Sequence, residues 1–233
     1  MKILAIDTAT LVSSVALVDE HKLLAEMTFN ISKTHSEKLL PFIDFILREA
    51  GLELADLSAV AVAAGPGSFT GLRIGMATAK ALAYGADKIV LGIPTLDALS
   101  YNVEASEKLI VPIMNARRNE VYTAIYRRKA LGLERLTDYL ALTPEQLRLD
   151  LLARAEDVLL LGDGVPEFAE IFKEEKFYFA EANNCLNRAS SIGKIAMERL
   201  LRGEADDYFL LSPAYLRTSQ AEVNWQAKFG VKE

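Results

Sequence analysis

Blocks of apolar and polar residues follow one another along the chain in an order that predicts its secondary structure. Three short apolar runs joined by turn-like links predict an antiparallel meander of strands. These runs span 2–10, 13–20 and 22–31. Apolar residues then recur three or four positions apart over 36–50 and again over 70–84, which predicts two amphipathic helices flanking a buried strand. With a strand at 88–94 and one more helix, the predicted order is β-β-β-α-β-α-β-α.

Near residue 105 the same order begins again. Three further strand candidates are followed by a helix that Thr143 can cap, with Pro144 in its first position. A strand and two helices complete this part of the pattern. The strand candidates here span 108–117, 120–128, 133–142 and 157–164. Two halves with one element order predict a duplicated α/β fold.

The repeat also predicts where the chain divides. We expect an N-terminal lobe at 1–104 and a C-terminal lobe at 105–217, with a late helix of the second lobe able to pack back on the first. The tail at 218–233 has little apolar periodicity, so we expect it to be partly disordered or bound to a partner.

Composition narrows the class of protein. The 233 residues are 51% hydrophobic, yet no apolar run approaches the roughly 18 residues of a membrane span, and the N-terminal run ends at Asp7, as a strand would. The single cysteine, Cys185, excludes an internal disulfide and fits a reducing, cytoplasmic compartment. A net charge of −6 argues that this chain does not itself supply most of the contacts to a nucleic acid. Another subunit of a complex could hold the nucleic acid.

The stretch GPGSFTGLRIG (65–75) has the appearance of a phosphate-binding loop between a strand and a helix. It fails the Walker A template, which needs a lysine after its second glycine, and its glycine spacing also misses the dinucleotide-binding pattern. The glycines predict instead a tight turn that Ser68 or Thr70 can cap. Weak phosphate binding at the helix N-terminus is the less favoured interpretation.

Other residues at strand ends are candidates for the same chemistry. Asp7 and Thr8 follow the first strand, where the carboxylate could orient a metal-bound phosphate or, equally, cap its own turn. Gly162 and Gly164 flank an aspartate after a later strand and could approach a nucleotide, but a turn alone would explain them. The candidate nucleotide contacts are therefore Asp7, Thr8, Ser68, Gly162 and Gly164.

Two further motifs favour structural over chemical interpretations. Arg117 and Arg118 lie in a turn between strands, where they could bind an anion; we favour pairing with Glu120. His35 has Leu39 four positions later in place of a second histidine, and no other cluster of metal-binding side chains is evident, so no metal site is expected. No G-x-S-x-G nucleophile motif is present in the sequence.

Small residues recur at spacing four along the helix at 70–84, where they form a stripe without large side chains. The stripe consists of Gly71, Gly75, Ala79 and Ala83. It could pack tightly on the helix's own sheet or admit a helix of another chain, as small-residue stripes allow. The second alternative predicts a partner face that includes the preceding helix. Its residues would be Leu39, Phe42, Ile43, Ile46, Gly71, Ile74, Gly75, Thr78, Ala79 and Leu82.

Several of these motifs together resemble the bacterial TsaB family, formerly YeaZ, over residues 1 to about 217. They are ILAIDTAT, GPGSFTGLRIG, NARRNEVY, LLGDG and SPAYLR. The resemblance implies the two-lobed fold shared by actin, sugar kinases and Hsp70. It also implies a non-catalytic partner of the paralogous transferase TsaD, with TsaE in a larger assembly, in forming N6-threonylcarbamoyladenosine at position 37 of tRNAs that read ANN codons.

The resemblance further implies that the helices at 36–50 and 70–84 contact TsaD or, in isolation, a second copy of the chain. No cofactor is required, ATP or ADP could bind at a complex interface, and tRNA would be met only through the complex. TsaD carries its metal on an H-x-x-x-H helix, so His35 with Leu39 implies that this metal site is absent. The family commonly has Asp where this chain has Asn115. The alternatives are a nucleotide-dependent enzyme or peptidase of the same fold, or a stand-alone homodimeric binding protein.

Overall fold

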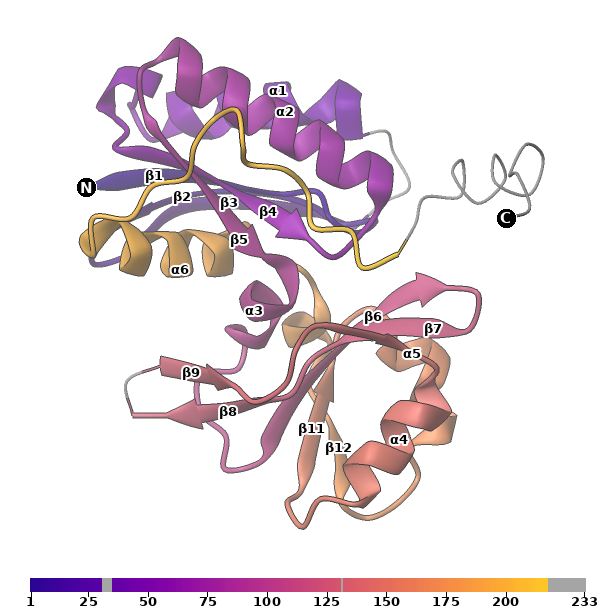
Figure 1. Ribbon diagram of the computed structural model, residues 1–233. Helices are drawn as coiled ribbons and strands as arrows, with labels where there is room; N and C mark the ends of the chain where they lie inside the picture. The colour runs from indigo at the N-terminus through magenta and orange to yellow at the C-terminus, as the bar shows by residue number, and fades with distance from the viewer. Residues whose placement is uncertain (31–34, 131, 218–233) are drawn as a thin grey trace, which may run out of the picture.

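The first half of the chain forms a five-stranded sheet with helices on both faces (Figure 1). The computed structural model describes residues 1–30, 35–130 and 132–217. The strand order is β3-β2-β1-β4-β5, with β1–β3 antiparallel and β4 and β5 parallel to β1. The strands are β1 (Lys2–Asp7), β2 (Ser13–Asp19), β3 (Leu23–Phe29), β4 (Ala59–Gly65) and β5 (Ile89–Pro94).

The second half repeats this topology, which confirms the predicted duplication. Its main path is β10-β7-β6-β11-β12; when the β8–β9 hairpin is left out of the count, this is again the order third, second, first, fourth and fifth strand. The β8–β9 hairpin is an addition joined to β6. The strands are β6 (Leu109–Arg117), β7 (Glu120–Thr123), β8 (Tyr126–Lys129), β9 (Gly132–Arg135), β10 (Leu140–Leu142), β11 (Val158–Leu161) and β12 (Phe177–Phe179).

Helices cover both faces of each sheet, and the last helix of each half lies against the other half's sheet. On the first sheet, α1 and α2 cover one face and α6 covers the other. On the second, α4 and α5 cover one face, while α3 packs on the other. The helices are α1 (His35–Glu49), α2 (Phe69–Gly85), α3 (Thr95–Ser100), α4 (Pro144–Leu152), α5 (Val165–Phe168) and α6 (Ala189–Leu201), with short 3-10 turns at Leu54–Asp56, Ala169–Ile171 and Ala182–Cys185.

The structure corrects three expectations about the elements of the second half. The strand expected at 120–128 is two strands, β7 and β8, and the strand expected at 133–142 is likewise two, β9 and β10. Strand β12 was missed because only three residues separate its flanking polar segments. The tail at 218–233 lies outside the described residues.

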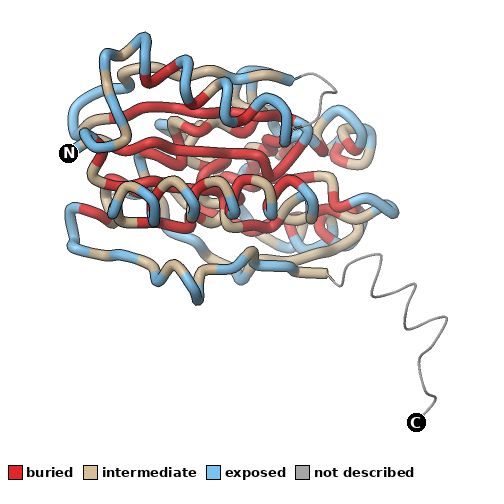
Figure 2. Tube along the Cα trace, turned by 90° about the horizontal axis from the view of Figure 1, so that it is seen from above, coloured by how far each residue is buried: buried red, intermediate tan, exposed pale blue. Residues whose placement is uncertain are grey.

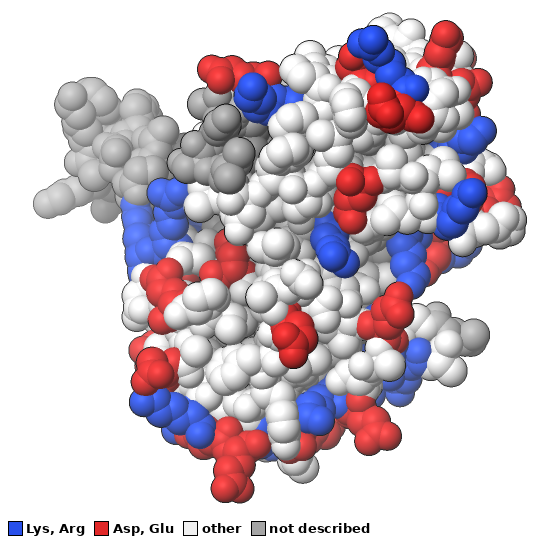
Figure 3. All heavy atoms as spheres, turned by 180° about the vertical axis from the view of Figure 1, so that it is seen from behind, with Lys and Arg blue, Asp and Glu red and all other residues white. Residues whose placement is uncertain are grey.

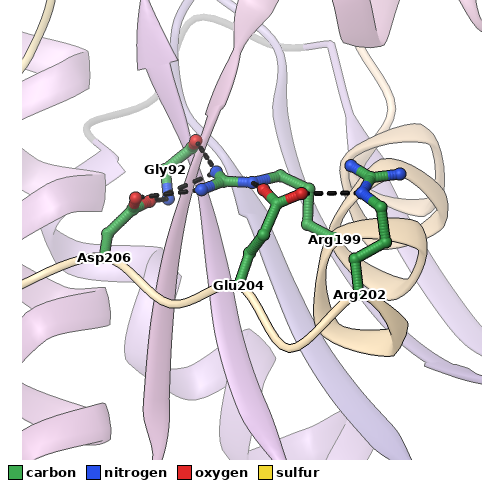
Figure 4. Close-up of polar contacts among 5 residues, drawn as sticks. All are labelled: Gly92, Arg199, Arg202, Glu204 and Asp206. Atoms are coloured by element: carbon green, nitrogen blue, oxygen red, sulfur yellow. Dashed lines mark hydrogen bonds and ion pairs between the residues drawn. The ribbon is translucent and has the colours of Figure 1, made fainter.

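A returning segment (residues 204–217) runs back along β5, the edge strand of the first sheet. The Asp206 amide donates to Val90 at 3.0 Å, and the Asp206 carboxylate accepts the Gly92 amide at 2.7 Å. Arg199 of α6 connects β5 to the returning segment: it donates to the Gly92 carbonyl and forms ion pairs with Asp206 and Glu204 (Figure 4). The segment thereby covers a sheet edge that would otherwise expose unpaired backbone groups.

The stripe of small residues on α2, part of the predicted partner face, packs on the chain's own sheet, which is the first of the two alternatives that the sequence leaves open. Gly71, Gly75 and Ala79 are buried, and a Cβ at Gly75 would lie within 3.0 Å of the Thr8 hydroxyl. Three α1 residues of that face, Leu39, Ile43 and Ile46, are likewise core residues. Figure 2 shows the buried stretches along the strands and the inner sides of the helices, with exposed residues on the outer turns.

Close approach of α2 to the loop after β1 makes Gly75 intolerant of a side chain. We expect Gly75→Ala to lower the free energy of unfolding by about 1–3 kcal/mol, the usual cost of overpacking. Gly85→Ala is the matched control, because Gly85 ends the same helix and has nothing within 4 Å of an added Cβ. We expect it to change stability by less than about 1 kcal/mol. Urea denaturation measures both, and equal effects would contradict the packing described.

Candidate functional site

The loop after β1 and the start of α2 are joined by hydrogen bonds between backbone and side chains. The Thr8 hydroxyl donates to the Gly71 carbonyl at 2.8 Å, and the Ser68 amide donates to the Ala9 carbonyl at 2.6 Å. Ser68 also caps α2 by accepting the Gly71 amide. A phosphate-binding loop presents such amides outward to its ligand. Here the Ser68 and Gly71 amides are used inside the chain.

Asp7 ends β1 in full burial and holds two parts of the chain together. Its carboxylate accepts the Ala9 amide at 2.8 Å and the Asn187 side-chain amide at 3.1 Å. Burial raises the pKa of Asp7 to about 6, against the lowering effect of these two hydrogen bonds. Of the two roles that the sequence left open for Asp7, capping its own turn is the one that these contacts describe.

The loop after β11 corresponds to the β4–α2 loop of the first half, and it too is closed by a backbone hydrogen bond within the chain. Gly162 has φ +114°, and an added Cβ there would lie within 3.0 Å of the Ile113 carbonyl. The Gly164 amide donates to that carbonyl at 3.0 Å. These glycines therefore let the turn pack against β6, and the Gly164 amide is not available to a nucleotide.

Asn115, at the end of β6, uses both ends of its amide side chain. Its nitrogen donates to Glu167, its oxygen accepts the Arg117 amide at 2.7 Å, and its backbone amide donates to Asp163 at 2.9 Å. An aspartate here would lose the donor and oppose a second carboxylate at Glu167. Asn115 thus fits its surroundings in this chain.

The turn between β6 and β7 differs from the sequence expectation. Glu120 pairs with Arg217 at 2.8 Å, so its expected pairing with Arg117 and Arg118 is wrong. Arg217 also donates to the carbonyls of Ala116 and Arg117, at 2.9 and 3.3 Å. No local pattern predicts this contact, because Arg217 lies about 100 residues away along the chain.

The outer face of α1 and α2 carries apolar side chains that are not in the core. Leu40 and Phe45 are 55% and 53% exposed, although they belong to the most apolar part of α1. Four residues of the predicted partner face are only half-buried: Phe42, Ile74, Thr78 and Leu82. Exposed apolar residues on α1 beside half-buried ones on α2 are typical of a protein-binding surface. Leu40 was left out of the predicted face because spacing alone does not show which apolar positions turn outward.

A polar cavity of about 750 Å³ lies beside β5, α3, α6 and the β8–β9 hairpin. Asp97 accepts the hydroxyls of Tyr126 and Tyr139, at 2.7 and 2.8 Å. Tyr101, one helical turn after Asp97, donates to Glu198 at 3.0 Å. These hydrogen bonds connect the two halves of the molecule, and they provide partners for several polar groups that line the cavity.

The described residues contain no group of three or more His, Cys, Asp and Glu side chains arranged to hold a metal ion. Leu39, which stands where a second metal-binding histidine would be needed, is buried in the core. Within the described ranges, no helix is long and apolar enough to cross a membrane.

Comparison with known proteins relates most of the chain to tRNA-modifying proteins. Residues 22–225 match the family model described as TsaD, tRNA N6-adenosine threonylcarbamoyltransferase. Two curated relatives are tRNA threonylcarbamoyladenosine biosynthesis proteins TsaB. The Bacillus subtilis protein is 33% identical, over 97% of this chain and 98% of its own length. The Escherichia coli protein is 31% identical, over 95% of this chain and 96% of its own length.

A solved structure agrees with these relatives. YeaZ from Pseudomonas aeruginosa superimposes with a TM-score of 0.81 at 28% identity, over 92% of this chain and 99% of its own. Another P. aeruginosa structure, described as an uncharacterized protein with similarity to peptidase YEAZ, matches equally well, over 93% and 99%. The duplicated sheets have the actin, sugar-kinase and Hsp70 type of fold, as expected. This chain belongs to the TsaB (YeaZ) family of tRNA threonylcarbamoyladenosine biosynthesis proteins.

Proposed function

We propose that this chain is a non-catalytic subunit that binds and supports a TsaD-type transferase. The modification would be N6-threonylcarbamoyladenosine at position 37 of tRNAs that read ANN codons. The observation that carries the non-catalytic part is the closure of both strand-end loops by the chain's own backbone. A loop whose Ser68, Gly71 and Gly164 amides are already bonded offers few donors to a phosphate or an oxyanion.

The binding part of the proposal rests on the outer face of α1 and α2. Its apolar side chains lie on two adjacent helices, which suits a helical partner packing across both. In the cell the partner would be the TsaD-type transferase, with a TsaE-type protein in the larger assembly. In isolation a second copy could use the same face.

The remaining parts concern ligands and location. This chain would require no cofactor of its own, and ATP or ADP would bind, if anywhere, at an interface of the complex. It would meet tRNA within that complex. It would act in the cytoplasm, where charged tRNAs are used.

Reconstituted tRNA modification tests the proposal and its docking face together. We expect the TsaD-type transferase from the same source, supplied with threonylcarbamoyl donor, to lose most of its activity when this chain is omitted. Leu40→Asp with Phe45→Asp should act like omission and weaken association at least tenfold, because charges would be buried against the partner. Leu149→Asp is the control, since Leu149 is 63% exposed on α4, away from α1 and α2.

Two results would contradict this proposal. Full modification without the chain would exclude the supporting role. Unchanged association of the double α1 variant, with Leu149→Asp behaving identically, would exclude α1 as part of the docking face. Measurement of the unfolding midpoint distinguishes loss of binding from loss of fold.

Substitution of Asp7 tests whether this buried carboxylate is structural. The pKa of Asp7 is higher in the folded than in the unfolded chain. Ionisation of Asp7 therefore lowers the free energy of unfolding progressively as the pH rises from about 4 to 6, and the full loss persists above pH 6. Asp7→Asn removes this effect, and Asn187, whose side-chain oxygen has no partner among the described residues, can turn its amide to accept from the variant. The stability of the variant relative to the wild type should rise by about 3 kcal/mol between pH 4 and pH 8.

The same variant should leave tRNA modification by the complex unchanged. Chemical denaturation across this pH range and a modification assay at pH 8 provide the two readouts. If the free energies of unfolding of the variant and the wild type changed in parallel with pH, Asp7 would not be a buried acid with a raised pKa. A hundredfold loss of modification by a folded variant would instead make Asp7 catalytic.

A further inference from the structure

Three exposed arginines lie at the ends of elements from both halves of the molecule. Arg73 is in the first turns of α2, and Arg117 and Arg118 form the turn between β6 and β7. None of the three forms an ion pair with another described residue. Most other arginines of the described chain do form one. We call Arg73, Arg117 and Arg118 the arginine rim.

The returning segment brings these arginines to one side of the molecule. Arg73 donates from Nε to the Tyr215 hydroxyl at 3.0 Å. Only two residues later, Arg217 donates to the Arg117 carbonyl and pairs with Glu120. Two residues of extended chain span about 7 Å. In Figure 3 a cluster of Lys and Arg side chains lies at one edge of the face.

The turn holds Arg117 and Arg118 in a costly backbone conformation. Their φ angles are +63° and +56°, and that of Asn119 is +58°. The left-handed region is unfavourable for an arginine, because its Cβ lies too close to the following carbonyl oxygen. The hydrogen bonds from Arg217 and to Asn115 fix the turn despite this cost. The two guanidinium groups are thus attached to a rigid turn.

Aromatic rings accompany one of the charges. The Arg73 guanidinium lies 3.8 Å from the centroid of the Phe69 ring, and Phe69 packs against Tyr215 with ring centroids 4.7 Å apart. Proteins contact phosphate backbones mainly with guanidinium and ammonium groups, and single-stranded bases stack on aromatic rings.

We propose that the arginine rim contacts the phosphate backbone of the tRNA while this chain is assembled with its transferase. The inference rests on the proposed function for the presence of the RNA. An overall charge of −6 opposes RNA binding by the isolated chain, so the rim adds local contacts to RNA that another subunit holds. An acidic protein surface is the competing partner, and the test separates the two.

The test compares tRNA binding by the complex with and without two rim charges. Arg117→Asn with Arg118→Asn removes both, and asparagine tolerates the left-handed conformation, so the turn should persist. Arg127→Gln with Lys129→Gln is the matched control: it removes the same charge from β8, where both residues are in ion pairs. Affinity for unmodified tRNA is measured from about 50 to 200 mM salt.

We expect the rim variant to bind tRNA about tenfold more weakly at the lowest salt. Its slope of log affinity against log salt should be shallower by roughly 1.5, since each lost phosphate contact reduces the magnitude of that slope by about 0.7–0.9. The control should retain the wild-type affinity and slope. Assembly with the transferase, measured without RNA, should be the same for all three proteins.

Two outcomes would overturn the inference. Wild-type tRNA affinity and salt slope in the rim variant would show that the rim does not contact RNA. Weakened assembly with the transferase, without RNA, would assign the rim to an acidic protein surface. Failure of the proposed function is seen separately, as tRNA binding and modification by the transferase that do not depend on the wild-type chain at all.

Discussion

The close packing of α2 on the loop after β1 is the contact on which the rest of this structure depends. Gly71 and Gly75 let the helix approach until the Thr8 hydroxyl bonds the Gly71 carbonyl, at 2.8 Å. The same approach places Ser68 where its amide bonds the Ala9 carbonyl. This one contact therefore buries the small-residue stripe, and its hydrogen bonds use backbone amides that a phosphate would need. It also leaves the opposite side of α2, beside α1, as the side available to other molecules.

The second half and the returning segment extend this arrangement to the whole molecule. Each half places its last helix on the other half's sheet, so neither sheet has both faces covered by its own helices. Arg199 ties α6 to β5 and to the returning segment, and Arg217 ties that segment to the second half. Together these contacts indicate a body that presents fixed surfaces: an apolar face on α1 and α2, and a basic rim at the end of the returning segment.

Sequence patterns predicted the element order, the duplication and the fold because these depend on local periodicity and on short connections. Strand β12 escaped because three residues carry too little periodicity, and the 120–128 strand was not seen to divide. The direction of the α2 stripe could not be predicted, since small residues at spacing four suit a sheet as well as a foreign helix. The pairing of Glu120 with Arg217 was missed because it joins residues distant in sequence.

The central claim is that hydrogen bonds within the chain already use the backbone amides that a phosphate at the two strand-end loops would need. It concerns the isolated chain, and calorimetric titration of that chain with Mg·ATP tests it most directly. We predict no saturable heat of binding up to millimolar nucleotide, because the Ser68, Gly71 and Gly164 amides are already bonded. Saturable binding with a micromolar dissociation constant, abolished by Ser68→Ala with Asp7→Asn, would contradict the claim.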